Sequence, residues 1–274
     1  MTIMIVGACG SLGTELIRVL PKAAAFSHKE LDITDRKAVL DKISELKPSV
    51  VINAAAYTNV EGAETEKDAA FAINHAALES LVEACNKNKA RLIHFSTDTV
   101  FDGSKKDGYK EDDKPNPVNV YGKSKAAGEE VVRKCDDYML IRTSWLYGKN
   151  KSFPMKIIQR AKKDGVVRVV NDQFGSPTSA ADLADRIPEI MNSAKGIYHL
   201  TNSGVCSWFD FAREIIRLSG IKVDVVPIST AEYPSKTVRP KYGVLVNTKL
   251  KPLRPWKDAI VDYMKANKKD ICHG

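Results

Sequence analysis

The sequence lacks the features that mark a membrane-spanning protein or an exported one. No apolar run in its 274 residues approaches the roughly 20 residues needed to cross a bilayer. Its opening residues, MTIM, carry no basic segment ahead of an apolar one, so no signal peptide is evident. We therefore expect a cytoplasmic protein with no membrane partner.

Paired metal-ligand motifs are absent as well. The five cysteines are scattered, odd in number and without a Cys-x-x-Cys pair, which argues against a disulfide framework or a zinc site. The five histidines form no His-x-x-x-His or His-x-His group. We predict no catalytic metal and a reducing compartment.

A basic block of the kind that binds nucleic acid is also missing. The net charge of +8 permits attraction to anions, whether a nucleotide or a nucleic acid. The lysines, however, are spread among acidic neighbours, as at residues 110–113 (KEDD), and are not interleaved with aromatic residues. We expect a small-molecule anion and no nucleic-acid partner.

Apolar segments do alternate with helical ones through the first half of the chain. Strands are predicted at residues 3–6, 50–52, 92–95 and 138–141, and helices at 12–20, 36–46 and 69–85, with Asp35 as a helix cap and Pro48 as a stop. Strands that are apolar throughout and alternate with helices indicate a parallel sheet covered on both faces. The prediction is an α/β fold with a Rossmann-type, doubly wound parallel sheet.

The pattern changes beyond about residue 145. Helices are predicted at 155–163, 181–191 and 208–218 and strands at 166–170 and 197–200, separated by irregular polar loops such as 171–178 and 239–242. Such loops often line sites. We predict a dinucleotide-binding domain at 1–148 and a smaller α/β substrate-binding lobe mainly at 149–274, with crossing of the chain between them left open.

The first strand runs into a glycine turn at residues 7–13 (GACGSLG). Glycines at Gly7, Gly10 and Gly13 permit a tight turn and close approach of a pyrophosphate to a helix N-terminus. The spacing is Gly-x-x-Gly-x-x-Gly, not the commoner Gly-x-Gly-x-x-Gly, and a packing turn is the alternative. Its place directly after a strand favours nucleotide binding.

Tyr121 and Lys125 are spaced to share one face of a helix. A cation beside a phenol lowers the pKa of the phenol, which makes the tyrosine a usable proton donor. The pair alone usually marks a solvated helix face, so its weight comes from the glycine turn upstream. Together the two features indicate a reductase.

Further motifs continue in order at residues 31–35 (LDITD), 53–58 (NAAAYT), 96–103 (STDTVFDG), 121–125 (YGKSK), 142–148 (RTSWLYG), 172–178 (DQFGSPT) and 239–240 (RP). With these, the chain resembles the extended short-chain dehydrogenases/reductases that act on nucleotide sugars. The resemblance implies NAD(P)H-dependent reduction of the C4 ketone of dTDP-4-dehydro-6-deoxy-L-mannose to dTDP-L-rhamnose, a step in polysaccharide biosynthesis. It implies that Thr97 binds the substrate carbonyl, Tyr121 delivers the proton, and Lys125 orients the cofactor ribose and lowers the pKa of Tyr121.

The same resemblance implies the cofactor contacts. They are Gly7, Gly10, Ser11, Leu12 and Gly13 at the pyrophosphate, Asp32 and Ile33 at the adenine, Ala54, Ala55 and Ala56 beside the ribose and phosphates, and Tyr121 and Lys125. Asp32 as a mere neighbour of the helix cap is the alternative. Near Ser27, His28 and Lys29 no carboxylate stands ready for a ribose 2′-hydroxyl, which favours NADPH, with NADH as the second choice.

For the sugar nucleotide, the resemblance implies contacts from Thr58, Val60, Thr97, Asp98, Trp145 and Arg239. A guanidinium such as that of Arg239 grips phosphate through paired donors. An ordinary core aromatic and a surface salt bridge are the alternatives for Trp145 and Arg239. A homodimer and a structural Mg²⁺ between its subunits stay open.

Thr99 is the departure from the family pattern, which commonly has tyrosine there. Thr99 followed by valine is similar to sugar 4-epimerases, so an epimerase or a reductase of another 4-keto sugar stays an alternative. A dehydratase needs a glutamate at this position, and its absence argues against dehydration. A non-catalytic regulatory subunit, like that of methionine adenosyltransferase, is the remaining alternative, against which Thr97, Tyr121 and Lys125 weigh together.

Overall fold

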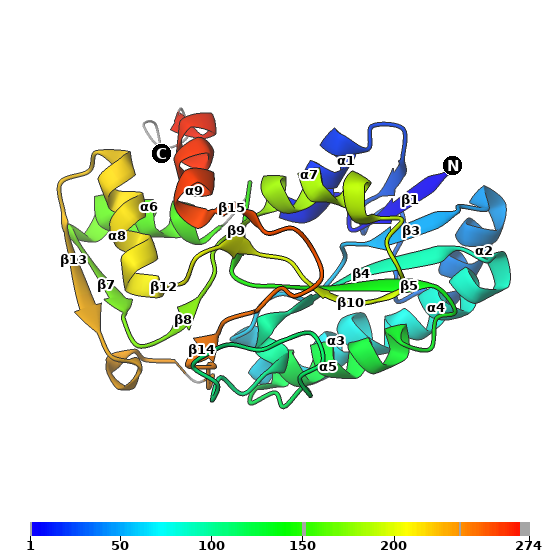
Figure 1. The fold of residues 1–274 in the computed structure, drawn as a ribbon, viewed down its shortest axis with the longest axis horizontal. Helices are drawn as coiled ribbons and strands as arrows, with labels where there is room; N and C mark the ends of the chain where they lie inside the picture. Colours follow the sequence, from blue (N-terminus) through cyan, green and yellow to red (C-terminus); the bar gives the residue numbers. More distant parts are fainter. Residues whose placement is uncertain (1, 150–151, 236, 269–274) are drawn as a thin grey trace.

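The larger of two lobes is built on a six-stranded parallel sheet in the order β10-β5-β4-β3-β1-β2 (Figure 1). The computed structural model describes residues 2–149, 152–235 and 237–268. The strands are β1 Ile3–Val6, β2 Ala24–Phe26, β3 Val50–Asn53, β4 Arg91–Thr97, β5 Tyr138–Thr143 and β10 Gly196–His199.

Helices cover both faces of this sheet. One face carries α1 (Ser11–Val19) and α7 (Ala180–Ile190), and the other carries α2 (Arg36–Leu46), α4 (Ala77–Asn88) and α5 (Val120–Val132) (Figure 1). The residues of strand β1 are all apolar because its side chains pack into the cores on both faces of the sheet. Met4 and Val6 pack on the α2 and α4 side, while Ile5 packs with Leu12 and Leu16 of α1. The predicted doubly wound sheet is confirmed.

The sheet reverses its order at β1, because β2 lies on one side of β1 and β3 on the other. Ligands of such sheets bind beyond the carboxyl ends of the strands at this reversal. Gly7 follows β1, Asn53 ends β3, and Thr97 ends β4. The predicted cofactor and catalytic residues therefore meet at one edge.

The predicted cap and stop of α2 are present: Asp35 accepts a hydrogen bond from Ala38 N at 3.0 Å, and Lys47 follows the helix with φ +44°. The helix predicted at 69–85 is present, but it is not α-helical throughout. It is divided into α3 (Lys67–Phe71), a π-helical turn η2 (Ala72–Ala76) and α4. The buried side chain of Asn74 in η2 bonds both the N–H and the C=O of Tyr57, at 2.9 and 3.0 Å, which favours the wider turn.

The smaller lobe packs α6 (Phe153–Asp164), α8 (Trp208–Ser219) and α9 (Trp256–Ala266) around buried Phe211 and beside the parallel pair β7 (Val166–Val170) and β13 (Asp224–Ile228). A second small sheet has the order β12-β8-β14. The short elements are β6 Leu146–Tyr147, β8 Phe174–Gly175, β9 Thr178–Ser179, β11 Asn202–Ser203, β12 Cys206–Ser207, β14 Tyr242–Gly243, β15 Leu253–Pro255, η1 Gly62–Glu64, η3 Asp98–Val100 and η4 Thr230–Glu232.

The chain crosses back to the larger lobe between α6 and α8. Helix α7 shares an apolar core with α1, and β10 pairs in parallel with β5. Residues 180–199 therefore pack in the larger lobe, a crossing that the sequence prediction had left open. An apolar helix and strand have the same pattern whichever layer they join, so periodicity could not locate them.

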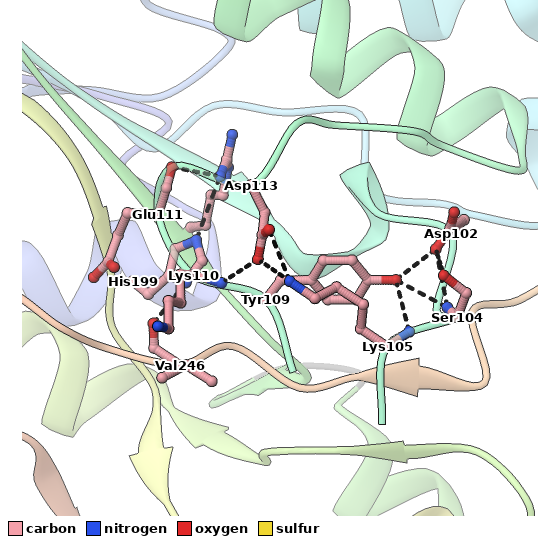
Figure 2. A network of polar contacts seen from close by, with 10 residues as sticks. Asp102, Ser104, Lys105, Tyr109, Lys110, Glu111, Asp113, His199 and Val246 are labelled. Carbon is pink, nitrogen blue, oxygen red and sulfur yellow. Dashed lines mark hydrogen bonds and ion pairs between the residues drawn. The ribbon is translucent and has the colours of Figure 1, made fainter. Parts of the chain in front are cut away.

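A polar network ties the loop after η3 to the C-terminal part of the chain (Figure 2). Asp102 accepts from Tyr109 and Ser104, at 2.5 and 2.7 Å, and these bonds hold the pKa of its carboxyl well below the usual range. At the other end, His199 Nδ1 lies 3.1 Å from the carbonyl oxygen of Val246. The network fixes the loop that follows the STDTVFDG motif.

Candidate active site

Around the glycine turn, segments of backbone approach one another too closely to leave room for a Cβ atom. Gly7 has φ +80°, and a Cβ there would lie 2.4 Å from the nitrogen of Ala55. A Cβ on Gly13 would lie 2.1 Å from the Gly7 oxygen. Gly10 precedes α1, and no side chain in the described structure caps that helix. Its first N–H groups are therefore available to an anion.

The other residues predicted at the cofactor offer mainly backbone. Leu12 and Ile33 are buried in the apolar cores, and the Ser11 hydroxyl donates to the Lys149 carbonyl at 2.6 Å. Asp32 accepts from the N–H and hydroxyl of Thr34, at 2.9 and 2.8 Å, so its carboxylate also stabilises the turn before α2. Ala54, Ala55 and Ala56 follow β3 with no bulk beyond Cβ.

One carboxylate does lie close to Ser27, but it is engaged there rather than ready for a ribose hydroxyl. Glu30 folds back so that its Oε2 accepts from the N–H and hydroxyl of Ser27, at 2.8 and 2.7 Å. These bonds lower the pKa of Glu30. Sequence reasoning missed it because Glu30 lies four residues beyond the strand end and only the turn brings it back.

A buried hydroxyl marks where a ligand fits over the strand ends. Thr143 Oγ1 at the end of β5 has no hydrogen-bond partner in the described structure, and Thr143 pairs in register with Thr97. A buried unsatisfied hydroxyl is costly. Together with the uncapped helix and the glycine turn, it fits a nicotinamide dinucleotide lying across this edge.

Helix α5 places Tyr121 in its first turn and Lys125 one turn later, after an Asn119 cap that accepts from Gly122 N at 2.7 Å. Thr97 lies near enough to the Tyr121 phenol to lower its pKa. Thr97 Oγ1 also lies 3.0 Å from Asp98 Oδ1. Three sequence-predicted residues, Thr97, Asp98 and Tyr121, thus form one cluster.

Within this cluster the Tyr121 phenol keeps its proton. Burial and the nearby Asp98 carboxylate raise the pKa of Tyr121 to about 12, although Thr97 acts to lower it. Burial raises the pKa of Asp98 to about 6 although Thr97 and Ser144 bond it. The expectation that Lys125 lowers the pKa of Tyr121 is wrong for this structure. Lys125 Nζ donates instead to the Phe95 carbonyl at 2.7 Å and contacts His94 Nε2 at 3.2 Å.

Two neighbouring cavities open from this cluster into the smaller lobe. The larger, about 320 Å³, is lined by basic and aromatic groups that include Lys156, Arg160, Arg168, Trp208 and Arg239. The smaller, about 60 Å³, is lined by Asp98, Thr99, Asn119, Trp145, Gln173, Trp208, Arg239, Pro240 and Gly243. The two share Gln173, Trp208 and Arg239, so they form one path that ends at Asp98.

Trp145 is held in place more firmly than an ordinary core aromatic. Its φ is +46°, and its ring stacks on Trp208 with centroids 3.5 Å apart and planes 9° from parallel. A Cβ on Gly175 would lie 2.5 Å from the Trp145 ring. Trp208, from α8, was missed by sequence reasoning because nothing in the pattern of α8 distinguishes it from a core residue.

The remaining predicted substrate residues are placed less centrally. Thr58 is exposed, and neither Thr58 nor Val60 is among the residues that line the two cavities. Arg239 lines both, but its guanidinium is paired with Glu61 at 2.9 Å. Among the described residues no group of three or more His, Cys, Asp or Glu side chains is placed to hold a metal ion, and no helix is long and apolar enough to span a membrane.

The fold is that of an extended short-chain dehydrogenase/reductase. More narrowly, the chain belongs to the RmlD substrate binding domain family, whose profile matches residues 1–269. It is 38% identical over 278 residues to the Bacillus subtilis spore coat polysaccharide biosynthesis protein SpsK, covering 96% of each chain. It is also 38% identical over 282 residues to a Streptomyces griseus dTDP-4-dehydrorhamnose reductase, covering 96% of this chain and 93% of that one. The Bacillus anthracis dTDP-4-dehydrorhamnose reductase, crystallised with NADP, superimposes with a TM-score of 0.92 at 36% identity, covering 97% of this chain and 100% of that one. The family resemblance drawn from the sequence is confirmed.

Proposed function

We propose that this protein is a dTDP-4-dehydrorhamnose reductase, which uses NADPH, or NADH less well, to reduce the C4 ketone of dTDP-4-dehydro-6-deoxy-L-mannose to dTDP-L-rhamnose. The observation that carries the proposal is the cluster of Thr97, Asp98 and the protonated Tyr121 phenol where the substrate path ends. The family membership and the NADP complex of a relative support it.

The nicotinamide cofactor, when bound, supplies the hydride. Thr97 and Tyr121 present hydroxyl groups to the ketone oxygen, which develops negative charge as the carbonyl is reduced. Because the pKa of Tyr121 is raised to about 12, the phenol carries its proton throughout the physiological range. Tyr121 then gives that proton to the sugar oxygen, and Lys125 in its charged form stabilises the phenolate left behind.

The path into the smaller lobe suits a nucleotide sugar. Lys156, Arg160, Arg168 and Arg239 line the larger cavity and offer positive charge to a diphosphate. The sugar then reaches the smaller cavity between the Trp145–Trp208 stack and Asp98. In this proposal Asp98, Trp145 and Arg239 contact the substrate, and Thr58 and Val60 border it from the loop after β3.

The test is NADPH oxidation by the purified protein with dTDP-4-dehydro-6-deoxy-L-mannose generated in situ, and identification of the product by NMR. The proposal expects oxidation that depends on the sugar and yields dTDP-L-rhamnose. NAD that stays bound through purification, with interconversion of C4 epimers and no net oxidation, would instead identify an epimerase.

A second candidate is reduction of a different dTDP-4-keto sugar. Thr99 favours it, because this small side chain lines the cavity next to Asp98 where the family commonly has tyrosine. A comparison of kcat/KM for the rhamnose precursor and for other dTDP-4-keto-6-deoxyhexoses decides between them.

We further propose that the reaction takes place in the cytoplasm and that two copies associate as a homodimer. Sedimentation with and without Mg²⁺ and EDTA tests the dimer and any Mg²⁺ between its subunits. A monomer under all these conditions would reject both the homodimer and the Mg²⁺ between its subunits.

A further inference from the structure

A buried chain of polar groups stands behind Lys125 and reaches from β3 across β4 to α5. Asn53, His94 and Lys125 are 1%, 1% and 2% exposed. Asn53 Nδ2 lies 3.1 Å from His94 Nδ1, and His94 Nε2 lies 3.2 Å from Lys125 Nζ. The proton transfer proposed for Tyr121 does not use His94 or Asn53.

A backbone donor fixes the orientation of the Asn53 amide. The N–H of Ala55 donates to Asn53 Oδ1 at 3.0 Å, and an N–H cannot accept. The amide nitrogen of Asn53 therefore faces His94, and since it only donates, His94 Nδ1 must accept. A neutral imidazole whose Nδ1 is unprotonated carries its proton on Nε2.

This proton conflicts with a charged lysine. An ammonium only donates, so Nε2–H and Nζ–H would face each other as two donors across 3.2 Å. A neutral amine has a lone pair that accepts from His94 Nε2–H, while one of its own N–H groups donates to the Phe95 carbonyl at 2.7 Å. The uncharged amine thus satisfies each hydrogen bond in the chain.

We propose that His94, held in its Nε2–H tautomer by Asn53, is a positioning residue that donates to an uncharged Lys125 amine in the alkaline form of the free protein. Lys125 takes up a proton only by losing this bond or by turning the Asn53 amide against the Ala55 N–H. The charge of the lysine therefore varies with pH in the working range of the protein.

The charged groups around the pair agree with this account. From α5, Glu129 opposes the neutral form, but its carboxylate already binds Arg142 of β5 at 2.6 Å and the Ser96 hydroxyl of β4 at 2.6 Å. Strand β3 brings no titratable side chain, and from η3 Asp98 acts on Tyr121. Burial lowers the pKa of Lys125 to about 8, so the uncharged amine predominates above about pH 8. Burial also keeps the pKa of His94 well below its usual value, so the imidazole is neutral there.

The direct test is the tautomer of His94 in the free protein at pH 9, read from two-bond ¹H–¹⁵N correlations of ¹⁵N-imidazole-labelled protein. His199 is an internal control, because its Nδ1 faces the Val246 carbonyl and its Nε2 faces the Arg142 guanidinium. We expect Nε2–H at His94 and Nδ1–H at His199, with the signals assigned by their loss in His94→Gln and His199→Gln. His94 found as the Nδ1–H tautomer or as imidazolium overturns the proposal.

Asn53→Asp reverses the arrangement while keeping an acceptor for Ala55 N–H. Its second oxygen can only accept, so His94 must carry its proton on Nδ1 and accept from charged Lys125 through Nε2. We expect the tautomer to reverse and the alkaline limb of the kcat/KM profile to move up by about one pH unit or more. A shift of the limb without reversal reflects added charge alone and overturns the proposal.

The rate measurement rests on the proposed function, whereas the tautomer does not. A protein with the expected tautomers but no reductase activity would reject the proposed function and leave this inference standing. If Asn53→Asp does not fold, the wild-type spectrum, with its two histidines of opposite tautomer, decides alone.

Discussion

The guanidinium of Arg239 lies 2.9 Å from the carboxylate of Glu61, so the arginine predicted to hold the diphosphate is already paired between the two lobes. Glu61 also accepts from Ser235 and Thr237, at 2.9 and 3.0 Å. The bonds to Arg239, Ser235 and Thr237 outweigh burial and lower the pKa of Glu61. Any contact of Arg239 with substrate must therefore be shared with Glu61.

Arg239→Ala is expected to raise KM for the nucleotide sugar by about tenfold or more and to leave kcat within about threefold, since a phosphate contact stabilises ground and transition states alike. The exposed Arg213, which is outside both cavities, provides the matched control Arg213→Ala. An unchanged KM would show that Arg239 only pairs with Glu61.

Tyr121→Phe is expected to lower kcat by about 10²-fold or more, because it removes the proton donor used in the transition state. Cofactor affinity, measured by fluorescence titration with NADPH, should change little. Tyr138→Phe, in β5, is the control for loss of a phenol elsewhere. Near-normal turnover in Tyr121→Phe contradicts its assignment as the acid.

Cofactor selectivity is expected to be loose and to lean toward NADPH. The exposed His28 and Lys29 offer positive charge, while the Glu30 carboxylate is engaged by Ser27. Glu30→Gln should increase the preference for NADPH, because a carboxylate repels a 2′-phosphate. Comparison of kcat/KM for the two cofactors measures this. A wild-type preference for NADH beyond about tenfold, worth roughly 1.4 kcal/mol, is the contradicting result.

Much of the sheet could be predicted because β1, β3, β4 and β5 are buried on both faces and so are apolar throughout. The edge strand β10 and helix α7 could be recognised but not placed, because their layer depends on a crossing of the chain. At the site, spacing and motif are enough to predict Thr97, Tyr121 and Lys125 as candidates. The tautomer of His94 could not, since it follows from Ala55 and Asn53 meeting β4 in the folded protein.

Thr99→Tyr tests the position where this chain departs from its family. If the substrate is the rhamnose precursor, kcat/KM should stay within about tenfold of wild type, because one neutral hydrogen bond is worth roughly 0.5–1.5 kcal/mol. If the cavity suits a differently shaped sugar, the added ring should clash. A fall of about a hundredfold, with cofactor affinity and circular dichroism unchanged, would count against the rhamnose precursor.

The most direct test of the central claim is transfer of deuterium from NADPH labelled at C4 of the nicotinamide, on each face in turn, to dTDP-4-dehydro-6-deoxy-L-mannose. With one of the two labelled cofactors, the account predicts dTDP-L-rhamnose that carries deuterium at C4 of the sugar, seen by NMR as loss of the C4 proton signal. Product that keeps a full C4 proton signal with both labelled cofactors, or no product at all, would contradict it.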